Sequence, residues 1–218
     1  MLLSTAYFPP VSWFALAAKD FTLSPDRVIA SKVYLEANET YLKQTYRNRC
    51  RIMTSQGVEA LSFPIIHDGD YSITKVKVDY STPWVQRTER AITSAYENSA
   101  FFAYYGDELF SILDSKPERL WDLNLSIIRF FLDKIKIGAE IFPTASYTPR
   151  GESSQLYGED FRDIIHPKKP NTVLEDLGLG KEYFQVFKQK WGFVEDLSIM
   201  DLLFNEGPSS IIYLKKLP

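Results

Sequence analysis

The first third of the chain alternates short apolar runs with turn-forming residues, a pattern typical of β-strands joined by loops. Residues 2–7 predict a strand, which ends at Phe8-Pro9-Pro10 because proline lacks a backbone donor. Residues 12–18 then predict a helix, and residues 27–35 predict a second strand. If the two strands pair in parallel, they form a β-α-β unit, and ligands usually bind at the carboxyl edge of such strands.

A short loop that contains glycine, Ser55-Gln56-Gly57, lies between two further strand-like runs, residues 51–54 and 58–66. This spacing predicts an antiparallel hairpin. Residues 72–80 carry apolar side chains between charged ones and predict one more strand. The predicted sheet is therefore mixed, with a parallel part and an antiparallel part.

From residue 82 onward the apolar residues recur at helical spacing. Residues 84–99 predict a helix with Thr82 as its N-cap, and a second helix is predicted around residues 107–113. Residues 120–137 form the most apolar helix, which we expect to be central and largely buried. A short strand is predicted at residues 141–146.

The last quarter of the chain is more irregular. Residues 148–158 are rich in Pro, Gly, Ser and Glu and predict an exposed loop. Residues 198–204 predict an amphipathic helix whose N-cap is either Asp196 or Ser198. Gly207 is suited to end this helix in a left-handed conformation.

Together these elements predict an α/β (or α+β) fold. Its mixed β-sheet is built from the N-terminal β-α-β unit and the hairpin, and a mostly helical C-terminal half packs on it. The chain has 218 residues, 45% of them hydrophobic, and can bury a large core without disulfides or metals. A single domain is expected over residues 1–218, rich in sheet over 1–81 and in helix over 82–218.

Composition and charge argue against several classes of protein. The net charge of −3 is close to balance, so we expect no nucleic-acid partner. No run of about eighteen uncharged apolar residues is present, so no membrane span is predicted. The apolar N-terminal stretch lacks the positive region of a secretory signal, and a single cysteine fits a reducing compartment. A cytoplasmic protein is expected.

The motifs of several enzyme classes are missing from the sequence. It contains no phosphate-binding glycine loop, no zinc-type Cys/His spacing, no nucleophile elbow and no dinucleotide fingerprint, so neither a cofactor nor a metal is predicted. Cys50 is expected to be a buried strand residue, and His67 an exposed residue of a Gly/Asp turn. His166, close to Lys168 and Lys169, therefore stands out for acid/base chemistry beside an anion, with a structural role as the alternative.

The densest group of candidate binding residues is the stretch of residues 43–51, KQTYRNRCR. Guanidinium and amide groups at this density suit an anionic or hydroxyl-rich ligand, because arginine binds carboxylate and phosphate through two parallel hydrogen bonds. The alternative is a solvated polar edge of the sheet. Regular strand alternation would place Arg47 and Arg49 on one face and Asn48 on the other. One face must then be structural unless the backbone is irregular there.

Five motifs, in order along the chain, together resemble the WbqC-like family of bacterial proteins, in its Bacteroidetes-type branch. They are YFPPVSWF at 7–14, KQTYRNRC at 43–50, DYSTPW at 79–84, IHPKK at 165–169 and SIMDLLFNEGP at 198–208. The resemblance implies a bacterial cytoplasmic protein. It also implies a transferase of surface-polysaccharide (O-antigen-type) biosynthesis, which would carry an amino acid such as glycine, or another acyl group, to a sugar or nucleotide-sugar.

The resemblance also implies a set of site residues. The predicted catalytic residues are His166 and Glu206. Many relatives have histidine four positions after the tryptophan that matches Trp84, whereas Thr88 stands there in this chain. If that histidine is the family's base, His166 would have to replace it. The predicted substrate-binding residues are Tyr7, Lys43, Gln44, Arg47, Asn48, Arg49, Trp84, Lys168 and Asn205.

Two functions remain open at this point. The first is a transferase that binds a small anionic or sugar-containing ligand, and the second is a non-catalytic binding or assembly protein of cell-envelope biogenesis. In the second, the same polar residues would form an internal network that stabilises the fold. A polar cleft within reach of both Arg47 and His166 would favour the first function, and a closed, internally bonded Arg47 and Asn48 the second. The sequence indicates no oligomeric state.

Overall fold

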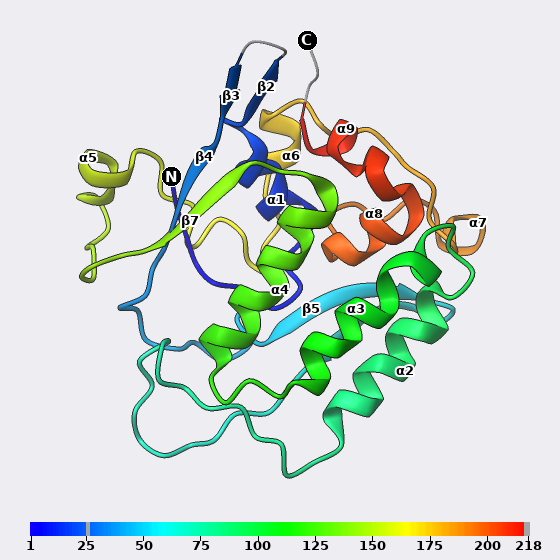
Figure 1. Ribbon diagram of the computed structural model, residues 1–218, viewed down its shortest axis with the longest axis horizontal. Helices are drawn as coiled ribbons and strands as arrows, with labels where there is room; N and C mark the ends of the chain where they lie inside the picture. The colour runs from blue at the N-terminus through cyan, green and yellow to red at the C-terminus, as the bar shows by residue number, and fades with distance from the viewer. Residues whose placement is uncertain (25–26, 216–218) are drawn as a thin grey trace.

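The computed structural model describes residues 1–24 and 27–215, and a three-stranded parallel sheet lies at its centre. The strand order is β1 (Leu2–Leu3), β4 (Ser31–Leu35), β7 (Ala139–Pro143), and Leu35 of the central strand faces both Leu3 and Pro143. Helix α1 (Val11–Ala18) connects the first two strands and packs on β4 (Figure 1). The predicted β-α-β unit is therefore confirmed, although its first strand is shorter than predicted.

The antiparallel strands lie outside the parallel sheet. Strands β5 (Arg49–Thr54) and β6 (Gly57–Ser62) form the predicted hairpin, and Gly57 adopts a φ of +109° in its turn. A second hairpin, β2 (Thr22–Ser24) and β3 (Arg27–Ile29), was not predicted, and it divides the expected strand at 27–35 in two. The α/β class is confirmed, but the parallel and antiparallel pairs form separate sheets rather than one.

The predicted strand at residues 72–80 is wrong. The chain makes only single bridges there, including Ile65 to Val78, and residues 72–76 form a turn. Ile73 and Val76 are both buried. Their spacing of three suits a turn that inserts two side chains into the core, whereas neighbours on one face of a strand are two apart.

The helical elements lie mainly in the second half of the chain. The long helix α4 runs from Leu120 to Ile135, close to its predicted bounds, and α3 begins earlier than predicted, at Phe102. Thr82 is not the N-cap of α2, because Pro83 occupies that position without a side-chain bond. The other bounds are α2 (Trp84–Tyr96), α3 (Phe102–Asp114), α5 (Ser153–Tyr157), α6 (Val173–Asp176), α7 (Lys188–Trp191), α8 (Ile199–Glu206), the 3-10 turn Gly207–Ser209 and α9 (Ser210–Leu214).

The helices connect the separate sheets through one apolar core. Helix α1 packs between β4 and the C-terminal helices α8 and α9, while α2 and α8 contact β5. Helix α3 lies beside α2, α4 and α8 (Figure 1). Short α5 projects at the edge of the molecule in the same view, within the region predicted to be an exposed loop.

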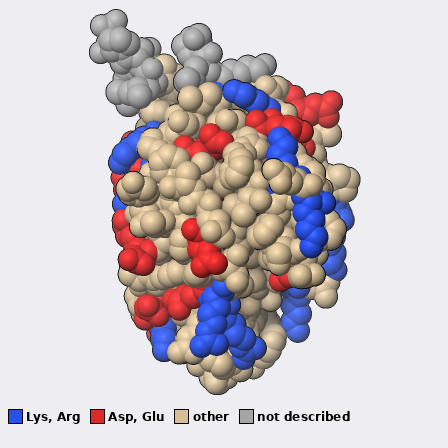
Figure 2. Space-filling model, turned by 90° about the vertical axis from the view of Figure 1, so that its right-hand side faces the viewer, with Lys and Arg blue, Asp and Glu red and all other residues tan. Residues whose placement is uncertain are grey.

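Lysines, arginines and acids are interspersed on the face shown in Figure 2, around an area without charged residues. This face carries no continuous field of one sign. Among the residues described, no helix combines the length and apolar character needed to cross a membrane.

Asp196 caps a helix other than the one predicted. Ser198 is the N-cap of helix α8, and its hydroxyl accepts the amide of Met200. Gly207 follows the last residue of the helix with a φ of +52°, as predicted. The Asp196 carboxylate instead accepts the backbone N–H of Ser12 at 2.7 Å and its hydroxyl at 3.0 Å. Because this carboxylate lies at the N-terminus of α1, it accepts a backbone amide that has no partner within the helix. Its negative charge also interacts favourably with the positive end of the helix dipole.

We predict that Asp196→Ala lowers the free energy of unfolding by about 2 kcal/mol, measured by urea denaturation. The lost cap costs about 1 kcal/mol. Alanine costs about 1 kcal/mol more at the observed φ of +56°, because its side chain, unlike that of aspartate, cannot hydrogen-bond locally to support a left-handed backbone. Asp196→Asn is the matched control, because asparagine tolerates this backbone and keeps an acceptor oxygen. Equal stability of the alanine variant and the native chain would contradict the cap.

Candidate functional site

The polar residues of the site follow directly after the parallel strands. Ser4 comes after β1, Glu36 after β4, and Thr144 after β7. The side chain of Glu36 is fully buried, and it accepts the hydroxyl of Thr144 at 2.6 Å. Because parallel strands end at one edge, these three residues are brought together where α/β folds usually bind ligands.

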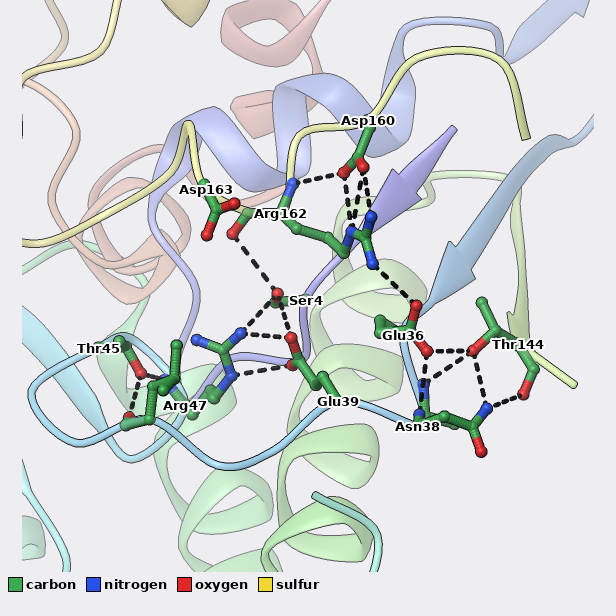
Figure 3. A network of polar contacts seen from close by, with 12 residues as sticks. Ser4, Glu36, Asn38, Glu39, Thr45, Arg47, Thr144, Asp160, Arg162 and Asp163 are labelled. Carbon is green, nitrogen blue, oxygen red and sulfur yellow. Dashed lines mark hydrogen bonds and ion pairs between the residues drawn. The ribbon is translucent and has the colours of Figure 1, made fainter. Parts of the chain in front are cut away.

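Two arginines neutralise two buried glutamates at this edge (Figure 3). Arg162 donates to Glu36 at 2.9 Å and to Asp160 at 2.6 Å. Arg47 forms a bidentate pair with Glu39 through its Nε, at 2.8 Å, and its Nη2. The hydroxyl of Ser4 lies between the pairs, 2.9 Å from Nη2 of Arg47. The two ion pairs are therefore parts of one buried network.

The network shifts the pKa values of its acids in opposite directions. Burial raises the pKa of Glu39 above its ordinary value, although the hydrogen bond and charge of Arg47 oppose it. Asp160 is also desolvated by burial, but the hydrogen bonds of Arg162 outweigh this and lower its pKa. Arg47 thus favours the ionised form of Glu39 against the effect of burial.

A polar cleft opens beside the network and consists of two adjoining hollows. The first hollow has a volume of about 260 Å³, and the second about 330 Å³. They share the residues Leu42, Arg47, Arg150, Arg162 and Asp163. The first hollow is also lined by His166 and Lys169, and the second by Asn38, Glu39, Thr40 and Tyr147. The cleft that the enzyme hypothesis required, within reach of Arg47 and His166, is present.

Lys169 differs from the arginines of the first hollow. Arg47 pairs with Glu39 and Arg150 with Asp163, while Arg162 pairs with both Glu36 and Asp160. Within residues 1–24 and 27–215, by contrast, no carboxylate lies at ion-pair distance from Lys169. An anion entering the first hollow would therefore meet an ammonium group that is not engaged in an ion pair with any described residue.

His166 is half-buried in the wall of the first hollow. Its Nδ1 lies 3.1 Å from the backbone N–H of Lys168 and accepts it. Burial, followed by the charges of Lys169, Lys168 and Arg47, lowers the pKa of His166. The imidazole is therefore neutral at pH 7, with its proton on Nε2. It can donate a hydrogen bond to a ligand, whereas a role as base requires it to release the Lys168 amide.

The backbone of residues 43–51 is irregular around Arg47. The chain turns through residues 43–48, with Gln44 at a φ of +61°, and becomes a strand only at Arg49. Arg47 can therefore turn inward to Glu39, while the amide of Asn48 donates to the carbonyl of Phe63 at 2.8 Å. The expected alternation does not apply before Arg49.

The stretch also holds neighbouring segments together through its backbone. The carbonyl of Tyr46 accepts the amide of Tyr7 at 2.8 Å, and the carbonyl of Arg47 accepts the side chain of Asn124 at 2.8 Å. The stretch thereby joins the loop after β1 to helix α4. Structural contacts and a residue that lines the cleft occur within a few positions of each other.

Only two predicted site residues, Arg47 and His166, line the cleft together. Gln44 and Lys168 are exposed and contact each other through their side chains. Lys43 is exposed, and Arg49 is half-buried with its Nε unpartnered among the described residues.

Other predicted site residues belong to the core. Tyr7 is fully buried, 4.8 Å from the ring of Phe63, and Trp84 donates to the carbonyl of Asp79. Burial raises the pKa of Tyr7 well above its ordinary value. Thr88 is also buried and lines neither hollow, so a residue at this position does not complete the cleft.

Cys50 and His67 behave as predicted. Cys50 is buried in β5, and burial raises the pKa of its thiol. His67 is exposed, with Nδ1 at 3.1 Å from the hydroxyl of Tyr71. Neither residue lines the cleft.

Sequence reasoning missed the buried acids of the network and most of the aromatic residues of the cleft. Glu36 follows directly after a predicted strand, so the rule that ligands bind at the carboxyl edge of parallel strands could have found it. Arg150 lies in the segment 148–158, which was predicted only as an exposed loop, and Tyr147 lies just before it, outside every predicted element. No local pattern marked them.

Comparison with known proteins identifies the family. The family model described as the WbqC-like protein family matches residues 6–213. The chain belongs to the WbqC-like protein family. It is also 27% identical over 198 residues to the "Uncharacterized protein Rv1507c" of Mycobacterium tuberculosis, which covers 80% of this chain and 84% of that protein. No solved structure matches the chain.

The last motif of this WbqC-like protein, residues 198–208, serves the core. Asp201 is fully buried and accepts both the hydroxyl of Tyr183 and the amide of Gln185 at 2.8 Å. Asn205 donates to the carbonyl of Asp201, and Glu206 accepts the amide of Phe184. Asn205 and Glu206, predicted as binding and catalytic residues, line neither hollow.

Burial raises the pKa of Asp201 to about 6 from an ordinary value of 3.8, although hydrogen bonds from Tyr183 and Gln185 oppose the shift. Asp201 therefore keeps its proton to a higher pH in the folded chain than in the unfolded chain. The protonated side chain stabilises the fold fully below the unfolded pKa of about 4, and this contribution is lost as the pH rises through 6.

We predict that the native chain loses about 2.5 kcal/mol of stability between pH 4 and pH 7.5 relative to Asp201→Asn, which does not titrate. Urea denaturation of both proteins across this range measures the difference. Parallel pH profiles would contradict the prediction, because they would show that Asp201 titrates alike in the folded and unfolded chains.

Proposed function

We propose that the cleft binds a small anionic sugar derivative, such as a sugar phosphate or nucleotide-sugar, and that the protein is a transferase acting on it. The observation that supports this proposal is the meeting of Arg47, His166 and the unpaired Lys169 around one hollow. Phosphate and carboxylate are the groups that such donors bind best. The neutral imidazole adds an N–H donor suited to a hydroxyl or phosphate oxygen.

The transfer step follows from the family resemblance rather than from the cleft. It would carry an amino acid such as glycine, or another acyl group, to the sugar during surface-polysaccharide biosynthesis in the cytoplasm. The cleft supports the binding part of this proposal, because it gathers donors for an anion at the carboxyl edge of the sheet.

A non-catalytic binding or assembly protein of cell-envelope biogenesis is the second candidate. Two contacts favour it. Nδ1 of His166 already accepts the amide of Lys168, and Arg47 is already paired with Glu39. In this arrangement His166 is not poised as a base. Both candidate functions include binding of the ligand, so only a measurement of turnover distinguishes them.

We predict that Lys169→Ala weakens the binding of UDP-glucose and hexose 1-phosphates about tenfold, because one hydrogen bond to a charged group is worth about 1.5–3 kcal/mol. Isothermal titration calorimetry at low salt measures the affinities. Lys168→Ala is the matched control, since it removes the same charge from the neighbouring residue, which does not line the cleft. It should change binding less than about twofold.

Equal losses in the two lysine variants would contradict the proposed site, because they would reflect the general charge of the segment. Absence of binding by the native chain would also contradict it. Arg47→Ala is a poorer test, because it leaves Glu39 as an unpaired buried charge and destabilises the fold.

We predict that the transferase adds a glycyl or acetyl group to a bound nucleotide-sugar when the corresponding thioester is supplied. A hydroxyl or amine of the sugar would attack the thioester carbonyl, forming an ester or amide while the thiol leaves. Mass spectrometry of the sugar before and after incubation detects the added group. The Lys169→Ala variant should show slower addition at low sugar concentration. Intact binding without any mass change across glycyl and acetyl donors would favour the non-catalytic candidate.

A further inference from the structure

Tyr147 is an exposed aromatic residue in the wall of the second hollow. About half of its surface is accessible, 52%, so its ring contributes little to the apolar core. The ring lies 5.7 Å from the guanidinium carbon of Arg162, which is buried and fixed by Glu36 and Asp160. One side of the ring thus rests on a rigid cation, and the residue borders open space.

The backbone around Tyr147 is anchored on both sides. The amide of Thr144 donates to the carbonyl of Leu35 at 2.9 Å, and the amide of Thr148 donates to Glu36 at 3.3 Å. The carbonyl of Thr148 also accepts Nη1 of Arg162 at 3.0 Å. Tyr147 is therefore presented on a segment held at the edge of the parallel sheet, and little further ordering is needed when a ligand binds.

The arginines that line the second hollow all have acidic partners, unlike Lys169 in the first. Arg47 is paired with Glu39, Arg150 with Asp163, and Arg162 with Glu36 and Asp160. The uncharged polar side chains of Asn38, Thr40 and Tyr147 complete the polar lining. Because its charges are already paired, such a surface offers hydrogen-bond donors and acceptors that suit an uncharged group rich in hydroxyls.

We infer that the second hollow holds the sugar ring of the ligand, packed against Tyr147, while the anionic group lies in the first hollow near Lys169. This assignment rests on the proposed function, which supplies the anion. The two hollows adjoin along Arg47, Arg150 and Arg162, so one ligand can span both. The apolar C–H face of a pyranose packs on an aromatic ring, and its hydroxyls reach the amide and hydroxyl side chains around it.

Calorimetry with two kinds of probe tests the assignment. Hexose 1-phosphates of glucose, galactose and N-acetylglucosamine carry both parts of the ligand, and inorganic phosphate carries only the anion. Tyr147→Ala should weaken the tightest-binding hexose 1-phosphate about tenfold and leave inorganic phosphate unchanged. Tyr147→Phe should retain most of the affinity, because the ring is kept. Lys169→Ala should weaken both kinds of probe.

Tyr104→Ala is the matched control, because Tyr104 is 77% exposed on α3 and lines neither hollow. Thermal unfolding of each variant confirms that it remains folded. Hexose 1-phosphates that bind no tighter than inorganic phosphate, or that bind Tyr147→Ala as well as the native chain, would overturn the sugar-ring assignment while leaving the anion site intact. If none of the probes binds the native chain, the proposed function fails as well.

Discussion

Two buried arginine–glutamate pairs hold the carboxyl edge of the parallel sheet together. The side chains of Glu36 and Arg162 are 0% and 6% exposed, and those of Glu39 and Arg47 are 10% and 7% exposed. Charges so far from water remain ionised only while they are paired and hydrogen-bonded, and removing one partner costs about 3–5 kcal/mol. The loops after β1, β4 and β7 are therefore constrained as one unit.

The same constraint shapes the cleft. Arg47 and Arg162 are each held by a buried acid, so their guanidinium groups line the hollows in fixed positions. The free positive charge comes from Lys169, on a separate segment beside the network. Ser4 joins the two pairs through contacts with Arg47 and with the carbonyl of Arg162. The two hollows thus share a partition of paired charges, and Lys169 stands on one side of it.

The family motifs divide between the cleft and the core. Residues 43–50 and 165–169 contribute Arg47, His166 and Lys169 to the first hollow. Residues 7–14 and 198–208 instead contribute to the packing of helices. Ser12 of the first motif receives the cap from Asp196, and Asp201 of the second accepts the hydroxyl of Tyr183 inside the core. A shared motif therefore does not by itself indicate contact with a ligand, because a buried polar group that must be hydrogen-bonded constrains a sequence as strongly as a binding site does.

Local patterns were sufficient for much of the fold. The apolar spacing of residues 120–135, the turn at Gly57 and the glycine after α8 predicted these elements because helix periodicity and left-handed turns depend on neighbouring residues alone. The strand predicted at 72–80 failed, since its buried residues anchor a turn against distant partners. The separation of the sheets also depends on packing that no local pattern reports.

For the site, the sequence by itself determined the chemistry available: a dense group of cations and amides at residues 43–51, and a histidine beside two lysines. Only the tertiary structure decided which of these groups face the cleft. The irregular turn before β5 directs Arg47 to Glu39, and Glu36 finds its partner Arg162 at a separation of 126 residues. Such pairings depend on where parallel strands end in space, which is why the acids and Tyr147 escaped prediction while Arg47 and His166 did not.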